Sequence, residues 1–505
     1  MIVGGYPERC VKPPWLHQLE GTRTLIERPK FILWDDVGMG KSKQVVDAVC
    51  ELFIRGEVDS LVVVVPGFAR SVWASLNPLL GEFVQHVWPG INYELNEYSA
   101  HSKFNPARQA RNPMQPTLQI VVTNYEFIRR HVNGTWPNLT PLRKWAALRS
   151  TWLVLDESWS IESYKAHQAK ACYLLRTSCQ RVTLLNGTPG APERLFTQFQ
   201  ILDPKILDVK NYFHFRARYL IMGGFDNREV VDYQRMDDFH ARTKDYALRR
   251  EGGLDLPERM PPITIEARLN DKEWAIYKAM RDDLVAWIDE GNASVARQAG
   301  VRTLRLCQIL AGFVGGVENI DPDNPNLFET PVTTEVREIG RAKLDAVLDF
   351  LSAVDLQKVI LWCGFKPEMD RLGIELAKHR WGVHYLRGDQ KPAERDATKE
   401  AFAPGSPEGR LAMVGHPRAG GAGLNFSGAS MAIHVTNGWS WRNRHQADGR
   451  IDRPGQKRRP RFVDVVATGP DGQKTVDHGI VAALRSSADT ADWTAGMWRR
   501  VLTDE

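Results

Sequence analysis

The sequence predicts an α/β protein with two lobes, each built around a parallel β-sheet, and a helical region between the lobes. Three observations predict this class. Short apolar runs recur between amphipathic stretches over residues 31–185, and a second series of such runs occupies residues 359–466. Between the two series, the stretch at residues 270–291 has helical character.

The first series contains five runs with the length and composition of buried strands. Helices cover both faces of a parallel sheet, so its strands show continuous apolar runs rather than alternation. The intervals between the runs leave room for crossover connections. The runs are FILW from Phe31, LVVVV from Leu61, IVVT from Ile120, WLVL from Trp152 and VTLL from Val182.

The second series has the same character and predicts a second parallel sheet. Its runs are VILW from Val359, LAMV from Leu411, MAIHV from Met431 and FVDVV from Phe462.

These patterns divide the chain into four expected regions. They are a first lobe at 1–235, an inter-lobe join with helical protrusions at 236–340, a second lobe at 341–480 and a C-terminal helical tail at 481–505.

Composition excludes several classes of protein. At 43% hydrophobic and 25% charged residues, the chain of 505 residues is typical of a globular protein with more than one domain. No apolar run approaches the length of a membrane span, so no membrane partner is expected. The six cysteines form no CxxC pair, which indicates neither a zinc site nor a disulfide framework and favours a reducing, cytoplasmic setting. A net charge of +5 is too small to identify a nucleic-acid-binding protein by itself.

The stretch FILWDDVGMGKSKQ, which begins at Phe31, has features of a phosphate-binding loop between a strand and a helix. Gly38 and Gly40 allow close approach of the backbone to phosphate, Lys41 supplies a positive charge, and Ser42 supplies a hydroxyl for Mg²⁺. The usual pattern, GxxxxGK[ST], has a glycine where this chain has Asp35. The alternative for this stretch alone is a glycine turn followed by a helix cap.

A second motif is the acidic pair Asp156 and Glu157, which follows the apolar run WLVL. Adjacent carboxylates at the end of a buried strand are costly unless they face a cation or a reactive water. We expect Asp156 to hold Mg²⁺ and Glu157 to orient and deprotonate the attacking water. The alternative, a helix cap after a strand, is less favoured because the pair follows a phosphate loop.

The third motif is HQADGRIDRPGQ from His445, in which Arg450 and Arg453 lie three residues apart. On a helix, both guanidinium groups would project from roughly the same face and could stabilise charge on a γ-phosphate. A solvated basic face is the default interpretation of such a cluster, but the pattern QxxxRxxRxGQ is more specific than charge alone.

Together these motifs resemble the SWI/SNF-type helicase-like ATPases of helicase superfamily 2. Members carry DEMGLGKT as their phosphate loop, so the resemblance makes an acidic residue at Asp35 normal. Further blocks follow in the family's order, among them PWLHQLEG, VVVVPGFARSVW, VVTNYEFIRR, LLNGTP, the join YALRREGGLDLP and RAGGAGLNFSGAS. The resemblance implies two RecA-like lobes with helical insertions between the coupling motif and the second lobe, closing on ATP and Mg²⁺.

Carried over residue by residue, the resemblance assigns the site. Gln18 is expected to recognise adenine, Gly187 and Thr188 to couple hydrolysis to motion, and Ser42 and Asp156 to hold Mg²⁺. The expected catalytic residues are Lys41, Asp156, Glu157, Arg450 and Arg453. The expected ATP-binding residues are Gln18, Gly38, Met39, Gly40, Lys41, Ser42, Gly423 and Gln446.

The resemblance also implies a DNA-dependent motor that contacts the nucleic-acid backbone through loops at the carboxyl ends of strands. The expected contacts are Arg70, Asn124, Arg418, Gly420 and Trp439. The remaining tryptophans, of 16 in the chain, are expected to be core and packing residues, although Trp441 could also lie near DNA.

The chain departs from the family pattern at several positions. DESW stands where the family has DEAH, so Trp159 replaces a histidine that helps couple hydrolysis to motion. Glu162 replaces a lysine, and His416 and Pro417 stand where the family has serine and threonine. These departures affect the expected coupling and DNA grip rather than the phosphate ligands.

Three functions remain open at this level. The first is a translocase that moves along duplex DNA and remodels DNA or protein–DNA complexes. The alternatives are a strand-separating or branch-remodelling helicase, and a nucleotide-gated DNA-binding factor without sustained translocation. The expected partners are duplex or branched DNA and proteins of replication, recombination or transcription, and the chain is expected to be a monomer of bacterial or viral origin.

Overall fold

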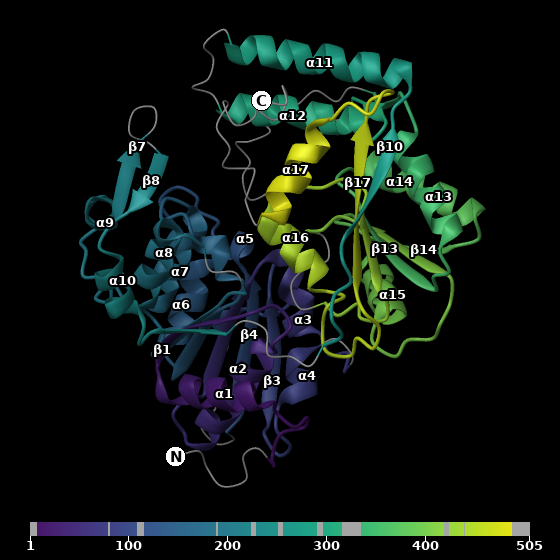
Figure 1. Ribbon diagram of the computed structural model, residues 1–505. Coiled ribbons are helices and arrows are strands. Elements are labelled where there is room, and N and C mark those ends of the chain that lie inside the picture. The colour runs from purple at the N-terminus through teal and green to yellow at the C-terminus, as the bar shows by residue number, and fades with distance from the viewer. Residues whose placement is uncertain are drawn as a thin grey trace. The chain divides into compact units, whose positions relative to one another are not determined.

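Two parallel β-sheets, each at the centre of one structural unit, organise the computed structural model of the chain (Figure 1). The structure describes residues 8–78, 81–100, 102–108, 116–187, 190–223, 229–250, 256–289, 296–315, 335–418, 424–438 and 440–486. The described residues up to 250 form the first unit, and those from 256 onward form the second. This confirms the predicted class of two RecA-like parallel-sheet lobes.

The first unit contains a seven-stranded sheet in the order β3-β4-β2-β5-β6-β1-β9, in which every pair of neighbours is parallel. Its central strands are buried on both faces, as the apolar runs predicted. The strands are β1 Lys30–Asp35, β2 Ser60–Val65, β3 Tyr93–Tyr98, β4 Leu118–Asn124, β5 Thr151–Leu155, β6 Arg181–Leu185 and β9 Ala247–Arg250.

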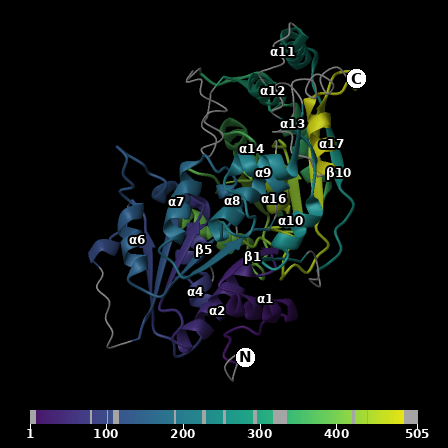
Figure 2. The same cartoon turned by 90° about the vertical axis from the view of Figure 1, so that its left-hand side faces the viewer.

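Helices cover both faces of this sheet. In Figures 1 and 2, α6, α7 and α8 lie on one side of the sheet and α1 and α2 lie on the other. An aromatic-rich core joins α6–α10 to the sheet, and the antiparallel hairpin of β7 (Leu220–Gly223) and β8 (Glu229–Tyr233) follows α9. The helices are α1 Leu16–Glu27, α2 Lys41–Ile54, α3 Arg70–Ala74, α4 Glu82–His86, α5 Tyr125–Ile128, α6 Leu139–Ala147, α7 His167–Arg176, α8 Pro192–Leu202, α9 Tyr212–Tyr219 and α10 Met236–Thr243.

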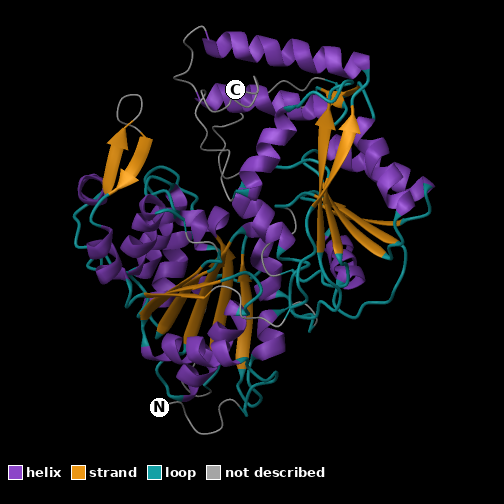
Figure 3. Ribbon diagram, viewed as in Figure 1, coloured by secondary structure: helices purple, strands orange, loops and turns teal. Residues whose placement is uncertain are grey.

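The second unit contains a six-stranded parallel sheet in the order β10-β17-β16-β13-β15-β14 (Figure 3). Helices α13 and α14 share a hydrophobic core with one face of this sheet. The strands are β10 Ile263–Arg268, β13 Lys358–Trp362, β14 Gly382–Leu386, β15 Leu411–Gly415, β16 Met431–His434 and β17 Arg461–Thr468, with the short antiparallel pair β11 Phe313–Val314 and β12 Arg337–Glu338. The helices are α11 Asp271–Asp289, α12 Ala296–Leu310, α13 Ala342–Ala353, α14 Lys366–Lys378, α15 Pro392–Phe402, α16 Trp441–Asp448 and α17 Val476–Arg485.

The stretch 236–340, expected as a separate join, is divided between the units. Strand β9 pairs with β1 in the first sheet, whereas β10 pairs with β17 in the second. The helical protrusion belongs to the second unit, because α11 and α12 pack together with α17 in one core. Helix α17 also crosses the expected boundary at residue 480. No helix of the described chain is long and apolar enough to cross a membrane.

Candidate nucleotide site

The phosphate loop connects β1 to α2 at the carboxyl edge of the first sheet. Gly38 and Gly40 have φ values of 89° and 70°, which residues other than glycine rarely adopt. At Gly40, a Cβ would also lie 2.3 Å from Nε2 of Gln18, so the loop closes against that side chain. Lys41 begins α2, and its Nζ donates to the carbonyl oxygens of Asp35 (2.7 Å) and Asp36 (3.1 Å).

Two side chains of α1 support the loop from outside. Nε2 of Gln18 donates to the carbonyl of Met39 (3.2 Å), and a ring nitrogen of His17 lies 2.9 Å from the same oxygen. Oε1 of Gln18 accepts from the backbone of Trp15 (3.0 Å). Gln18 is therefore buried beside the loop, where its expected role toward adenine remains a prediction. Ser42 occupies the second position of α2 and is partly exposed.

Asp35, the residue that stands in place of the common glycine, is an anchor of the loop. Its side chain is fully buried at the end of β1. Arg250 holds it with two hydrogen bonds, from Nε to Oδ1 and from Nη2 to Oδ2, each 2.7 Å long. Nε2 of Gln44 donates to the same carboxylate (2.9 Å). The position at which the usual pattern has glycine is therefore occupied by a buried charge that is paired with Arg250.

The acidic pair follows β5, two strands away from β1. Asp156 accepts a hydrogen bond from the indole Nε1 of Trp73 (2.8 Å), and Glu157 accepts one from the indole of Trp159 (2.7 Å). Burial and the neighbouring Glu157 raise the pKa of Asp156 to about 6. Two carboxylates this close to each other favour the binding of a cation, which would lie between the carboxylates and a phosphate.

The coupling motif lies between the loop and the acidic pair, because β6 separates β1 from β5. A Cβ at Gly187 would lie 3.0 Å from Val37 and 3.5 Å from Nζ of Lys41, so this glycine contacts the phosphate loop directly. The first unit thus brings together Gln18, Gly38, Met39, Gly40, Lys41, Ser42, Asp156, Glu157 and Gly187. Thr188 lies outside the described residues.

The donor set of this edge fits Mg²⁺ bound together with a nucleotide. Mg²⁺ takes one or two protein oxygens, waters and phosphate oxygens rather than a complete protein cage. The described residues contain no cluster of three or more His, Cys, Asp and Glu side chains that could hold a metal alone.

Trp73, Gln44 and Arg250 were not predicted as site residues. Trp73 was grouped with the core tryptophans, and it is indeed buried, but its indole also orients Asp156. For Trp73, the sequence signal was the block VVVVPGFARSVW, which ends at this residue. For Asp35, the signal was its position: an acidic residue at the end of a buried strand requires a cationic partner.

In the second unit, Arg450 and Arg453 do not share a helix face, because α16 ends at Asp448 and both lie in the turns that follow. Arg450 is buried, donates to the carbonyl of Pro417 (2.7 Å) and lies over the ring of Trp362. Nε of Arg453 donates to the carbonyl of Gly449 (2.6 Å). The expectation of a shared helix face was wrong because Gly449 ends the helix.

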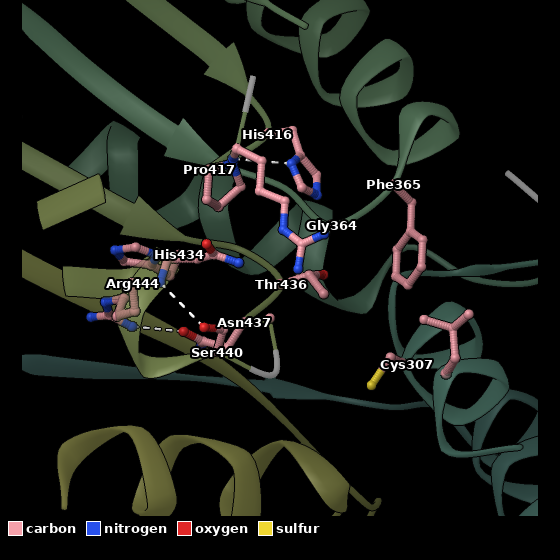
Figure 4. Close-up of a pocket in the computed structure, with 14 residues that line it drawn as sticks. Cys307, Gly364, Phe365, His416, Pro417, His434, Thr436, Asn437, Ser440 and Arg444 are labelled. Atoms are coloured by element: carbon pink, nitrogen blue, oxygen red, sulfur yellow. Dashed lines mark hydrogen bonds between the residues drawn. The ribbon is translucent and has the colours of Figure 1, made fainter. Parts of the chain in front are cut away.

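A pocket opens at the carboxyl ends of β13, β15 and β16 (Figure 4). His416 and Pro417 lie across it from Asn437, Ser440 and Arg444. None of the described residues that line this pocket carries a carboxylate. Its polar lining also includes Arg418, Thr436 and Asn443.

Burial and the charges of Arg418 and Arg450 lower the pKa of His416 to about 4, so this histidine is neutral near pH 7. Its Nδ1 accepts a hydrogen bond from the backbone of Arg418 (3.2 Å), which fixes the start of that loop.

Of the other expected nucleic-acid contacts, Arg70 is the first residue of α3 and Asn124 is the last residue of β4. Arg70 forms an ion pair with Glu97 (3.1 Å). Asn124 lies beside Gly67, where a Cβ would be 3.1 Å from its Nδ2, so the blocks VVVVP and VVTNYE meet. Gln446, which was expected to bind ATP together with Gly423, lies on α16 and is partly exposed. Gly420, Gly423 and Trp439 lie outside the described residues.

Comparison with known proteins adds independent evidence. Residues 17–310 match the model of the SNF2-related domain, and residues 342–455 match the helicase conserved C-terminal domain. The DNA repair and recombination protein RAD54-like of Homo sapiens is 23% identical over 91% of this chain and 64% of its own length. The uncharacterized ATP-dependent helicase YqhH of Bacillus subtilis is 21% identical over 97% of this chain and 81% of its own length.

Among solved structures, the SWI2/SNF2 ATPase core of Sulfolobus solfataricus in complex with dsDNA is similar with a TM-score of 0.40 and 19% identity, covering 98% of this chain and 97% of that one. The chain spans 64%, 61% and 40% of the lengths of the first three curated relatives. Since the SNF2-related model matches more than half of the residues, the chain belongs to the SNF2-related family of helicase-like ATPases.

Proposed function

We propose that this chain is an ATP-dependent translocase that moves along duplex DNA and remodels DNA or protein–DNA complexes. The observation that carries the proposal is the assembly of phosphate loop, acidic pair and coupling glycine on one sheet edge. In this proposal Lys41 and the loop backbone bind the β- and γ-phosphates, and Ser42 and Asp156 would hold Mg²⁺, which would supply positive charge toward the phosphates. Glu157 orients and deprotonates the attacking water.

The second unit supplies cations for the transition state in this proposal. Arg453 is the residue we assign to the γ-phosphate, because a planar guanidinium meets charge that grows during transfer. Arg450 is assigned to closure, because its buried contacts with Pro417 and Trp362 tie the motif to the sheet.

Charge distribution in the first unit favours a nucleic-acid backbone as partner. Residues 127–155 contain five Lys and Arg and no Asp or Glu, and residues 163–192 contain four Lys and Arg and no Asp or Glu. The chain as a whole has 66 basic and 61 acidic residues, so these two segments depart strongly from the average.

The two segments meet at a surface beside the tight antiparallel turn in which Val132 pairs with Thr135, and we call it the hairpin surface. It is formed by Arg130, His131, Trp136, Lys165 and His167. The ring of His131 lies 4.7 Å from that of Trp136 and 5.4 Å from that of His167. All except Trp136 are exposed. Cations and rings at one surface suit phosphate contacts, which position a protein on nucleic acid without selecting a sequence. The pocket around Arg418, whose described lining contains no carboxylate, suits the same chemistry.

The test compares ATP hydrolysis with duplex, single-stranded and branched DNA of equal length, and with RNA. Duplex DNA should stimulate hydrolysis most, and the stimulation should fall as salt rises. A triplex-forming strand should be displaced only with ATP, while a duplex with one overhang stays paired. Processive unwinding of the overhang substrate without stimulation by duplex would instead establish the strand-separating helicase.

Matched variants test the hairpin surface. The double variant Lys165→Ala and His167→Ala should weaken duplex binding and reduce its salt dependence, while DNA-independent hydrolysis is retained. Lys244→Ala, an exposed lysine at the end of α10, is the control and should bind as the unsubstituted protein does. Equal binding by both variants would remove the hairpin surface from the DNA contacts.

A further inference from the structure

Trp159 stands where relatives with the DEAH pattern have histidine, and its side chain turns back onto Glu157. The indole Nε1 donates a hydrogen bond of 2.7 Å to Oε2 of Glu157. This contact is possible because Glu157 has a left-handed backbone, with φ 51° and ψ 54°, just before the 3₁₀ turn Ser158–Ile161. A left-handed backbone is uncommon for a glutamate, and such conformations persist where surrounding contacts enforce them.

Hydrogen bonds from neighbouring helices hold this turn in place. Oγ of Ser158 donates to Oε1 of Gln198 (2.9 Å) on α8. Nε2 of Gln168 on α7 donates to the carbonyl of Ser160 (2.6 Å). Trp159 therefore sits in a turn fixed on both sides, so its indole donor has a defined direction.

The chemistry of the donor matters for a general base. Indole N–H is a donor only and does not titrate, unlike the imidazole that it replaces. It orients a carboxylate without neutralising it, so the negative charge remains for water activation. The neighbouring carboxylate is held by the same kind of hydrogen bond, because the indole of Trp73 donates to Asp156.

We propose that Trp159 is a positioning residue for hydrolysis, which holds the carboxylate of Glu157 in the direction of the attacking water through its indole N–H. The proposal rests on the proposed function of Glu157 as the base. In this role the indole orients the carboxylate of Glu157 in a way that does not depend on pH.

The test uses Trp159→Phe, which retains an aromatic ring and removes the donor. Hydrogen bonds to charged groups are strong, so single-turnover hydrolysis under saturating ATP should fall about 10–100-fold. ATP affinity should stay within about twofold, because the phosphate loop is unchanged. Trp145→Phe is the matched control: the indole nitrogen of Trp145 is buried without a hydrogen-bond partner in the described structure, so hydrolysis should be unaffected.

Trp159→His gives a readout that a packing role would not change. An imidazole restores a donor but titrates near pH 6.5. Hydrolysis should therefore recover at pH 8 relative to Trp159→Phe, and its rate divided by that of the unsubstituted protein at the same pH should show an additional acid limb below about pH 6.5. Recovery without that limb, or no recovery at pH 8, would show that the indole acts through packing.

Glu157→Gln separates failure of this proposal from failure of the proposed function. If Glu157→Gln abolishes hydrolysis while Trp159→Phe is normal or faster, only the positioning role is refuted. If Glu157→Gln hydrolyses ATP at the usual rate, Glu157 is not the base and both proposals fail. If the positioning role holds, Trp159→Phe should have no further effect in the Glu157→Gln background.

Discussion

Replacing Arg250 by methionine should destabilise the first unit more than any exposed charge substitution. Arg250→Met keeps an apolar stem of similar length but removes both hydrogen bonds to Asp35, whose carboxylate is fully buried. Removing one partner of a buried ion pair costs about 3–5 kcal/mol, because the other charge stays desolvated. For a unit of this size, 1 kcal/mol corresponds to roughly 2–4 °C in melting temperature, so the expected loss is roughly 6–20 °C.

Calorimetry of the full chain would measure this loss, with the transition of the first unit identified by its shift on adding nucleotide. Arg249→Met is the control, because Arg249 is the exposed neighbour on the same strand. Adding Asp35→Asn to Arg250→Met should restore part of the stability, since the buried group is then neutral and Gln44 remains beside it. Asp35→Gly, which installs the glycine of the common pattern, should destabilise. A shift below about 2 °C for Arg250→Met, or additive losses in the double variant, would refute the anchoring role.

Two further predictions concern the catalytic groups. Arg453→Ala should leave ATP affinity within severalfold of normal and lower the rate of DNA-stimulated hydrolysis by a factor of about 10³–10⁵, with little rescue by Arg453→Lys. Nucleotide binding measured by fluorescence and hydrolysis measured at saturating ATP would test both expectations. A fully active Arg453→Ala would contradict the assignment. Folding raises the pKa of Asp156 from 3.8 to about 6 through burial and Glu157, so its contribution to stability without nucleotide is greatest below about pH 4 and is lost as the pH rises through 6. Mg²⁺-nucleotide affinity, which requires the ionised carboxylate, should therefore weaken as the pH falls below about 6, and calorimetric titrations at pH 5.5 and 7.5 should show that Asp156→Asn removes this dependence.

The strands that the sequence predicted and those that it missed differ in position. All nine predicted runs are internal strands of their sheets. Within the two parallel sheets, the four strands missed, β3, β9, β10 and β14, are the edges, and the short antiparallel pairs β7-β8 and β11-β12 were not predicted either. An edge strand buries fewer of its side chains, as the mixed burial of YELNEY at β3 and GVHYL at β14 shows, so it lacks the continuous apolar run. The rule used to find strands therefore fails for a physical reason at every edge.

The candidate site shows a similar division. Residues that touch phosphate or metal in the proposed function lie in short, ordered motifs, so the chain order alone indicated them. The groups that hold those residues come from distant segments: Arg250 is 215 residues from Asp35, and Trp73 is 83 residues from Asp156. Their partners depend on which strands become neighbours, and strand order was not part of the sequence pattern. The turn after α16 was missed because a helix face was assumed for Arg450 and Arg453 without weighing the glycine between them.

The supporting groups of the nucleotide site follow one electrostatic logic. Asp35, which takes no part in binding in the proposed function, is neutralised by a charged partner, Arg250. Asp156 and Glu157 instead receive neutral indole donors, from Trp73 and Trp159. A cationic partner at Asp156 would cancel the charge that Mg²⁺ needs, and one at Glu157 would weaken the base. Indole donors fix the direction of both carboxylates and leave their charge available. Substituting Trp73 by a cationic residue should therefore impair Mg²⁺ binding even where the hydrogen bond to Asp156 is kept, which distinguishes the need for charge from the need for orientation.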